Sequence, residues 1–441
     1  MPSTQNCPGT PVGRVRWTVC ALLFFATTIN YVDRQILALL KPLLDEQLHW
    51  TNEQFGFVNS IFQGAYGLSL LGFGWFIDRF GIKLGYAVSI AAWSLAALGH
   101  ALVGSFAGFA LARAALGLGE GGNFPAAIKT VAVWFPRRER ALATSLFNSG
   151  ANVGAIIAPA LVPAVAFRWG WQAAFLLAGA AGFAWLYCWW RGYDAPEHSV
   201  RLGAAERQLI TGGAETATTV RPVPWRELLR HRQTWAFVAA KFLTDPVWWF
   251  LLIWLPDFFK QTRGLDLKKS WLHLVTVYAI VTLLSIAGGW VTGYATTRGW
   301  SVTQARKTGM LFFAFCVVPI VAVTRVGDWA AVLLLGLAGA AHQAWSANLY
   351  TTVSDIFPKN AVASVAGIGG LAGATGGMIF PLLTGWLLDS YKAAGNITAG
   401  YAVLFSVCAV AYLVTFVFHH VLAPSFVPLE LVPDKNLPAL P

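Results

Sequence analysis

Long apolar blocks, separated by short polar segments, occupy most of the chain. A membrane-spanning helix needs roughly 20 apolar residues, and twelve blocks approach or exceed that length. They lie at about 15–39, 54–77, 83–104, 106–134, 140–166, 172–191, 234–257, 271–296, 308–324, 328–356, 361–388 and 399–422. The pattern predicts an all-α membrane protein with twelve transmembrane helices.

One long polar segment, 192–233, separates the first six blocks from the last six. Its position predicts three parts along the chain. Residues 1–191 form an N-terminal six-helix bundle, 192–233 a cytoplasmic linker, and 234–441 a C-terminal six-helix bundle.

The two halves carry an internal repeat. Phe135-Pro136, followed by Pro159, recurs 222 residues later as Phe357-Pro358, followed by Pro381. This offset is close to half of the 441 residues. We therefore expect two pseudo-symmetric six-helix units, an arrangement that suits a transporter whose halves rock about a site at the membrane midplane.

Composition supports a membrane protein and excludes an ordinary soluble enzyme. Hydrophobic residues make up 56% of the chain and charged residues only 12%, whereas a soluble domain has about 25% charged residues. The five Cys show no metal-site spacing, and no phosphate-binding Gly-Lys-Ser/Thr loop or nucleophile motif is present. Neither an enzyme nor a bound cofactor or metal is expected.

The distribution of Lys and Arg predicts the orientation. With the N-terminus in the cytoplasm, 19 of the 31 basic residues lie on the cytoplasmic side and 8 on the opposite side, as the positive-inside rule requires. The net charge of +11 is then a topology signal, and a nucleic-acid partner is not expected. The polar residues before the first block are not typical of a cleavable signal peptide, so we expect this block to remain as a membrane anchor. We expect a multi-pass protein of a bacterial inner membrane, with both termini cytoplasmic and active as a monomer.

The segment from Gly74 to Lys83, GWFIDRFGIK, resembles the signature loop of the major facilitator superfamily. The resemblance implies a cytoplasmic gate at Asp78, Arg79 and Lys83, where charge-assisted hydrogen bonds can hold the ends of the two halves together. In the second half Gly293 stands where the acid is expected, so that part of the gate is predicted to be weaker.

Three other segments narrow the resemblance: Asn30 to Arg34, Gly119 to Ala126, and His342 to Lys359. They are similar to the anion:cation symporter branch of the superfamily, and to its hexuronate (glucuronate or galacturonate) transporters. The resemblance implies proton-coupled symport of a sugar-acid anion by alternating access. The alternatives are a transporter or exchanger of another organic anion (aldonate, tartrate or aromatic carboxylate) and a transport-inactive sensor.

Charged residues inside the apolar blocks are costly and need a reason. The resemblance places Arg34 at the substrate carboxylate, which its planar fork can bind with two hydrogen bonds; the alternative is a structural pair with Asp33. Asp33 and Arg113 are predicted to pair across the first and fourth helices, either as a proton-coupled switch or as a permanent packing bridge. Glu120, two turns after Arg113, is implied as the proton acceptor; the alternative is a neutral packing residue.

The 222-residue offset places His342 opposite Glu120. We expect it to face the central cavity and bind sugar hydroxyls or titrate; the alternative is a satisfied buried histidine. The other candidate substrate-binding residues are polar or aromatic side chains in apolar helices: Tyr31, Tyr66, Asn152, Gln343, Trp345 and Asn348. Lys241 and Asp245, four residues apart, are predicted to form a local structural ion pair.

Overall fold

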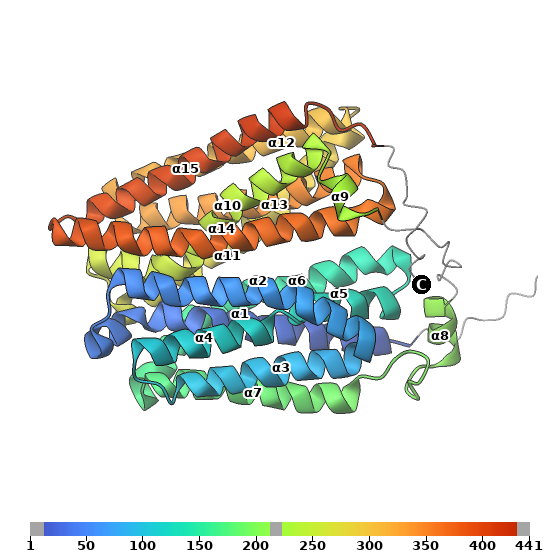
Figure 1. Ribbon diagram of the computed structural model, residues 1–441, viewed down its shortest axis with the longest axis horizontal. Coiled ribbons are helices and arrows are strands. Elements are labelled where there is room, and N and C mark those ends of the chain that lie inside the picture. The colour runs from blue at the N-terminus through green and yellow to red at the C-terminus, as the bar shows by residue number, and fades with distance from the viewer. Residues whose placement is uncertain (1–12, 212–222, 430–441) are drawn as a thin grey trace, which may run out of the picture.

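The computed structural model describes residues 13–211 and 223–429, and the regular elements within these ranges are all helices (Figure 1). The first half comprises α1 (Val15–Leu48), α2 (Asn52–Phe80), α3 (Ile82–His100), α4 (Phe106–Glu120), α5 (Asn123–Trp134), α6 (Arg137–Trp169) and α7 (Trp171–Gly192). The polar segment holds the short helices α8 (Ala204–Thr211) and α9 (Trp225–Leu228). The second half comprises α10 (Arg232–Arg263), α11 (Leu267–Thr297), α12 (Val302–Val317), the 3-10 helix η1 (Val318–Arg325), α13 (Asp328–Ile356), α14 (Lys359–Ala393) and α15 (Ile397–Leu422).

The predicted fold class is confirmed. In the part of the chain that the structure describes, ten helices are long and apolar enough to cross a membrane, with α12 and η1 forming one of them. Helix α11, of 31 residues, and the consecutive helices α4 and α5 supply the other two passages. The predicted block at 106–134 differs in detail, because its helix is interrupted at Gly121 and Gly122.

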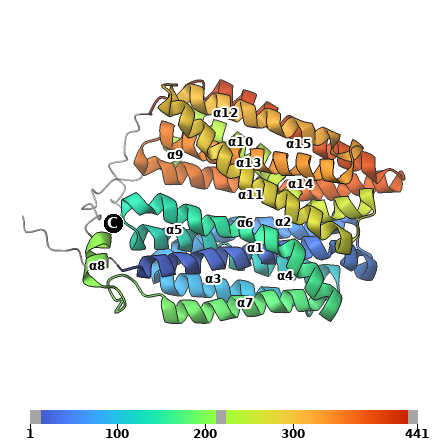
Figure 2. The same cartoon turned by 180° about the vertical axis from the view of Figure 1, so that it is seen from behind.

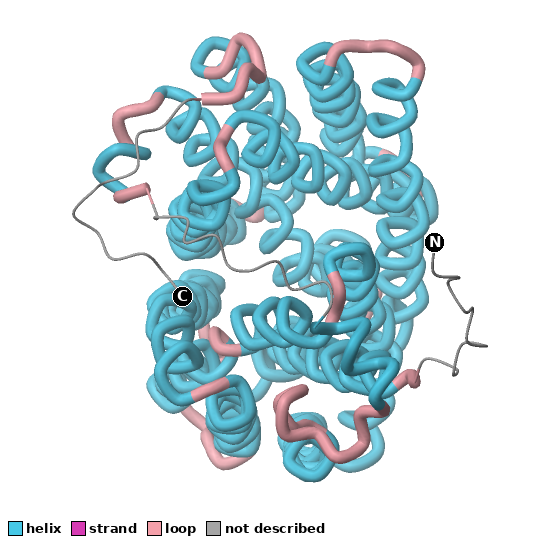
Figure 3. Tube along the Cα trace, turned by 90° about the vertical axis from the view of Figure 1, so that its right-hand side faces the viewer, coloured by secondary structure: helices cyan, strands magenta, loops and turns pink. Residues whose placement is uncertain are grey.

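The helices form two groups that lie side by side (Figures 1 and 2). Helices α1–α7 occupy one group and α10–α15 the other. The described chain begins and ends at the same end of the bundle, and Figure 3 looks onto that end. We call it the termini side, marked by Val15 and Leu422, and the opposite end the far side, marked by Leu48 and Arg263.

Tight glycine turns join neighbouring helices. Gly81 ends α2 and begins α3 with φ 88°, and Gly170 connects α6 to α7 in the same way with φ 86°. Residues that carry a side chain rarely adopt a positive φ, whereas glycine adopts it freely. The turn at Gly81 places Asp78 and Lys83 on the termini side.

The two halves pack closely on the far side. A Cβ atom on Gly56 of α2 would collide with the carbonyl oxygen of Pro381 in α14, and one on Gly385 would collide with that of Asn52. Small residues allow helix backbones to approach in this way inside membranes. The approach brings the N-terminus of α2 to Asp389, whose carboxylate accepts hydrogen bonds from the backbone N–H groups of Asn52 (3.1 Å) and Glu53 (2.8 Å). Asp389 therefore caps a helix of the opposite half.

A buried ion cluster joins the same ends. Lys41 Nζ contacts Asp45 Oδ2 and Asp257 Oδ1, each at 2.7 Å, and the Tyr401 hydroxyl donates to Asp257 Oδ2 at 2.5 Å. Lys41 is 1% exposed and Asp257 is fully buried. Lys41, Asn52, Glu53 and Lys260 make hydrogen bonds or ion pairs between α1–α7 and α10–α15, and these lie on the far side. The two halves are thus joined at that end.

The polar segment is more than a bare connection where it is described. Glu206 of α8 is fully buried and accepts hydrogen bonds from the backbone N–H groups of Val15 and Arg16, both at 3.2 Å. The Arg16 guanidinium bridges Glu206 (2.8 Å) and Glu139 of α6 (2.7 Å). These bonds fix α8 to the first half. Part of the predicted linker, 212–222, lies outside the described residues.

We predict that Lys41→Met destabilises the protein strongly, because it leaves Asp257 buried without its cation. Breaking a buried ion pair typically costs about 3–5 kcal/mol. Lys260→Met removes a partner of Glu46, which is 68% exposed, and exposed pairs contribute about 0–1 kcal/mol. Thermal unfolding in detergent measures both variants. Equal shifts in the two variants would contradict the assignment of Lys41 to the far-side closure.

Candidate functional site

An ion pair lies at the centre of the first half. Arg34 Nε of α1 donates to Glu120 Oε2, the last residue of α4, at 2.6 Å. Glu120 is fully buried and Arg34 is 9% exposed. The sequence marked both residues as candidates but did not pair them, because they are 86 positions apart. The charges of Arg34 and Glu120 compensate one another. Either charge alone would be costly inside a membrane protein.

The glycines around Glu120 explain its position. A Cβ atom on Gly119 would stand 2.5 Å from the backbone nitrogen of Trp93 in α3, so α4 must come close to that helix. The carbonyl of Gly119 accepts a hydrogen bond from the Ser89 hydroxyl at 2.6 Å, and that of Leu118 accepts one from Ser69. These hydroxyls satisfy carbonyl groups that the interruption of the helix leaves without intrahelical partners.

Aromatic rings surround the guanidinium. Arg34 Cζ lies 4.4 Å from the ring centroid of Tyr66, 5.3 Å from Tyr31, and 5.5 Å from both Phe62 and Trp249. Such distances allow cation–π attraction. Trp249 belongs to α10, so the second half contributes to the site. Sequence reasoning found Tyr31 and Tyr66 but missed Phe62 and Trp249; Phe62 was detectable as the residue one helical turn before Tyr66.

Arg34 retains hydrogen-bonding capacity. Its Nε donates to Glu120, and Tyr66 is a further hydrogen-bond partner of the guanidinium, whose Nη1 and Nη2 together carry four N–H donors. These two nitrogens form an edge of the guanidinium that matches the geometry of a carboxylate. The arrangement can therefore bind an anion while Arg34 remains beside Glu120.

The predicted direct pair between Asp33 and Arg113 is wrong in this structure. Neither carboxylate oxygen of Asp33 has a hydrogen-bond partner, although Asp33 is 1% exposed. Arg113 Nη2 donates to the carbonyl oxygen of Arg34 at 3.3 Å. Adjacent residues of a helix point about 100° apart, as 3.6 residues per turn require. The residue of α1 that forms an ion pair with α4 is therefore Arg34, and its partner is Glu120.

Unpaired polar atoms are concentrated near this pair. Both amide atoms of Asn30 and Gln63, and Glu120 Oε1, are buried without a hydrogen-bond partner within the described part of the chain. Buried polar groups in native proteins almost always have partners, including water or a ligand. Asn30 stands one turn before Arg34 on α1, and Gln63 follows Phe62 on α2. Sequence reasoning quoted Asn30 within a motif but did not assign it to the site.

The internal repeat relates Arg34 and Glu120 to a different pair of residues in the second half. Gly154 packs against the carbonyl of Thr28, and Gly376 packs against that of Phe242. Gly154 and Gly376 are the repeat-related glycines at the 222-residue offset, so α1 and α10 correspond at an offset of 214 residues. The two offsets differ because the connections between the helices differ in length.

At these offsets Arg34 corresponds to Trp248, and Glu120 to His342. The rings of Trp248 and His342 stack with centroids 5.6 Å apart and an interplanar angle of 4°. The Nδ1 of His342 is 2.5 Å from the Tyr412 hydroxyl, and the residue is 4% exposed. An aromatic stack thus occupies the place of the ion pair. His342 has the surroundings of a satisfied core histidine, and its substrate-binding role stays a prediction.

The other candidates of the second half divide in the same way. Trp345 is fully buried and packs edge-on against Tyr412, and Asn348 is buried with Oδ1 accepting from Arg306 at 3.4 Å. Gln343 and, in the first half, Asn152 are half-buried. Of the predicted site residues, the structure brings Tyr31, Tyr66 and Glu120 to Arg34, and it leaves Trp345 and Asn348 in the core of the second half.

The predicted gate residues have partners within the first half. Asp78 pairs with Lys129, and Lys83 Nζ contacts Asp194 Oδ1 at 2.8 Å. Arg79 makes no hydrogen bond or ion pair to another described residue. The expected bonds from this loop to the second half are therefore not formed in this state, where the halves are joined at the far side.

The counterpart of this loop in the second half includes Gly293. Its side-chain surroundings lie outside the described residues.

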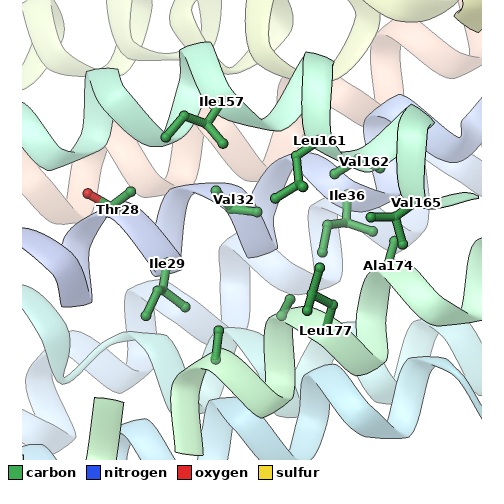
Figure 4. A pocket seen from close by; sticks show the side chains of 12 residues that line it. Thr28, Ile29, Val32, Ile36, Ile157, Leu161, Val162, Val165, Ala174 and Leu177 are labelled. Carbon is green, nitrogen blue, oxygen red and sulfur yellow. The ribbon is translucent and has the colours of Figure 1, made fainter. Parts of the chain in front are cut away.

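An apolar cavity of about 190 Å³ lies on the other face of α1, between α1, α6 and α7 (Figure 4). Val32 lines it, and Val32 is two residues from Arg34, so the two side chains leave the helix in nearly opposite directions. Three other lining residues, Ile157, Leu161 and Leu177, are 39–47% exposed. The cavity therefore opens at the surface of the bundle and is not part of the charged site.

Comparison with known proteins agrees with the fold. Residues 23–381 match the model of the Major Facilitator Superfamily. The chain belongs to this superfamily. It is therefore an integral membrane transporter by family and not an enzyme, and the resemblance derived from its motifs is confirmed.

Relatives of this superfamily member include the hexuronate transporter of Escherichia coli K12, which is 31% identical over 401 residues, covering 90% of this chain and 91% of the relative. The galacturonate transporter of Dickeya chrysanthemi is 32% identical over 281 residues, covering 63% and 81%. The solved D-xylose-proton symporter has a TM-score of 0.72 at 14% identity, covering 93% of this chain and 98% of that one. This last likeness shows the shared fold.

We predict a strong energetic coupling between Arg34 and Glu120. Arg34→Met leaves a fully buried carboxylate without its cation, and adding Glu120→Gln to the same molecule should recover part of the lost stability. Contacting residues typically couple by about 0.5–3 kcal/mol. Thermal unfolding of the two single variants and the double variant measures this coupling.

The control for this cycle is the exposed pair of Arg230 and Glu227, at 3.3 Å, with side chains 64% and 36% exposed. Its coupling should be close to zero. Additive effects of Arg34→Met and Glu120→Gln would show that the two charges do not depend on each other.

Proposed function

We propose that the protein is a proton-coupled symporter of a sugar-acid anion, a hexuronate such as galacturonate or glucuronate, and that it works by alternating access. The observation that carries this proposal is the buried pair of Arg34 and Glu120. Two relatives at 31–32% identity are named hexuronate and galacturonate transporters, which supports the substrate class.

The pair links the proton to the substrate through charge balance. A buried guanidinium needs an anion nearby, because an uncompensated charge is costly in a low-dielectric interior. Glu120 supplies that anion when it is ionised. When Glu120 takes up a proton it becomes neutral, and the substrate carboxylate then compensates Arg34. The proton therefore favours substrate binding, and its release favours substrate dissociation.

The surrounding residues suit a hydroxylated ligand. The rings of Tyr31, Tyr66 and Trp249 offer flat apolar faces for the sugar, and the unpaired amides of Asn30 and Gln63 offer donors and acceptors for hydroxyl groups. All of these residues come from one chain, so we propose that the monomer is the functional unit.

Alternating access requires the far-side closure to open. On this proposal the bonds of Lys41 with Asp257, and of Asp389 with the N-terminus of α2, break when the far side opens. The termini side then closes through the loop that contains Asp78, Arg79 and Lys83. The excess of Lys and Arg on the termini side supports a cytoplasmic location for that side, in a bacterial inner membrane.

Uptake of labelled galacturonate into proteoliposomes tests the proposal. With an inward proton gradient, we expect accumulation above the equilibrium level, and competition by unlabelled glucuronate. Uptake that ignores pH but depends on internal anion would replace symport with exchange. If galacturonate is neither bound nor transported, the proposed substrate class is wrong.

Glu120→Gln should abolish gradient-driven uptake while exchange of internal for external galacturonate continues. A glutamine keeps the size of the side chain but cannot exchange a proton with solvent. Glu227→Gln is the matched control, because Glu227 lies in α9 of the polar segment, and it should transport as the wild type does. Concentrative uptake by Glu120→Gln would exclude Glu120 as the proton carrier.

A further inference from the structure

A second buried ion pair stands in the transmembrane part of α10. Lys241 Nζ and Asp245 Oδ2 are 2.6 Å apart, which confirms the local pair predicted from their spacing. The Lys241 side chain is 6% exposed and that of Asp245 is 18% exposed. Charged residues in membrane-spanning helices usually face the interior of the bundle or a water-filled path and mark a functional site. The pair is not used by the proposed charge exchange between Arg34 and Glu120.

The pair shares a face of α10 with a residue of the central site. Lys241, Asp245 and Trp249 are each four residues apart, and residues at this spacing lie above one another along one side of a helix. The Trp249 ring is 5.5 Å from Arg34 Cζ in the opposite half. This face of α10 is thus turned toward Arg34, with Asp245 one turn and Lys241 two turns nearer the termini side.

The neighbours of the pair leave it open to a ligand. Lys241 Nζ lies 4.7 Å from the ring centroid of Tyr350, a residue that is 42% exposed. The ammonium has three donors; within the described ranges its partners are the Asp245 carboxylate and the Tyr350 hydroxyl, which leaves one donor for a ligand. Asp245 packs against Gly373 of α14, where any Cβ atom would collide with Oδ2. The carboxylate is therefore held in place while it keeps accessible surface.

The repeat supports a role at the substrate. At the 214-residue offset that relates α1 to α10, Asp245 corresponds to Tyr31, one of the rings around Arg34. Asp245 therefore holds in the second half the place that Tyr31 holds beside Arg34 in the first half.

We propose that the Lys241–Asp245 pair binds the hydroxyl groups at the end of the sugar acid opposite to the carboxylate held by Arg34, and that Asp245 excludes a second carboxylate at that end. The inference rests on the proposed function and adds a specificity-determining site to it. Lys241 donates to a hydroxyl oxygen and Asp245 accepts from a hydroxyl hydrogen. A carboxylate at the same position would meet the like charge of Asp245, which discriminates against it.

Galacturonate and galactarate separate this role from a purely structural one. The two anions differ at the end opposite to the shared carboxylate, where galactarate carries a second one. Their inhibition constants against labelled galacturonate uptake are measured in proteoliposomes containing the full chain. The wild type should prefer galacturonate. Asp245→Asn removes the repelling charge and leaves Lys241 without its anion, so the preference should shift toward galactarate by about tenfold or more.

The ratio of the two constants is independent of the amount of folded protein. If Asp245→Asn weakens both inhibitors by the same factor, the pair is structural and the proposal is overturned. Glu227→Gln is the matched control and should leave the ratio unchanged. A wild type that does not respond to galacturonate would overturn the proposed function itself, a result distinct from an unshifted ratio.

A double variant covers the case in which Asp245→Asn does not fold. Lys241→Met combined with Asp245→Leu replaces the ion pair by apolar side chains of similar size, which is often neutral for stability. It should weaken galacturonate by about tenfold or more through the loss of two charge-assisted hydrogen bonds. Wild-type affinity for galacturonate in this variant would contradict the proposal.

Discussion

A guanidinium buried between transmembrane helices must be accompanied by an anion, and this requirement organises the centre of the protein. Arg34 is 9% exposed and its anion in this structure is Glu120, which is fully buried. Leaving either charge buried without its partner costs about 3–5 kcal/mol, which is enough to destabilise the fold or to favour another conformation. A substrate carboxylate is the natural replacement for Glu120, because the terminal nitrogens of Arg34 carry more N–H donors than their partner Tyr66 can accept. In this account, transport depends on whether Glu120 or the substrate carboxylate compensates the charge of Arg34.

The rest of the fold serves this exchange. The interruption after Glu120, where Gly121 and Gly122 follow, lets α4 approach its neighbours, and serine hydroxyls bond the carbonyls next to the interruption. The second half contributes Trp249 to the ring cage, but in place of the ion pair it has a neutral stack of Trp248 and His342. The duplicated unit has thus become asymmetric: the charge exchange belongs to one half. On our proposal, the pair of Lys241 and Asp245 gives the other half its part in selecting the substrate.

The sequence patterns predicted the architecture and the residue types of the site, but they did not predict which charged residues pair. Twelve apolar blocks predict twelve passages because hydrophobic length is a local property that each block carries itself. Arg34 and Glu120 were found because a charge inside an apolar block stands out. Their pairing was not, since it depends on how α1 and α4 cross, and the same ambiguity led to the wrong pair of Asp33 with Arg113. Trp249 was missed for a related reason: one aromatic residue among many on an apolar helix has no signal until the two halves are packed together.

Proton uptake on substrate binding tests the central claim most directly. Calorimetric titration of the purified protein with galacturonate, repeated in buffers of different ionisation enthalpy at one pH, measures the protons that accompany binding. If the substrate carboxylate replaces an ionised Glu120 beside Arg34, binding takes up a proton from the buffer, and the Glu120→Gln variant binds without that uptake. Binding to the wild type with no proton uptake at any pH at which it binds, or with the same uptake in the variant, would contradict the exchange of anions at Arg34.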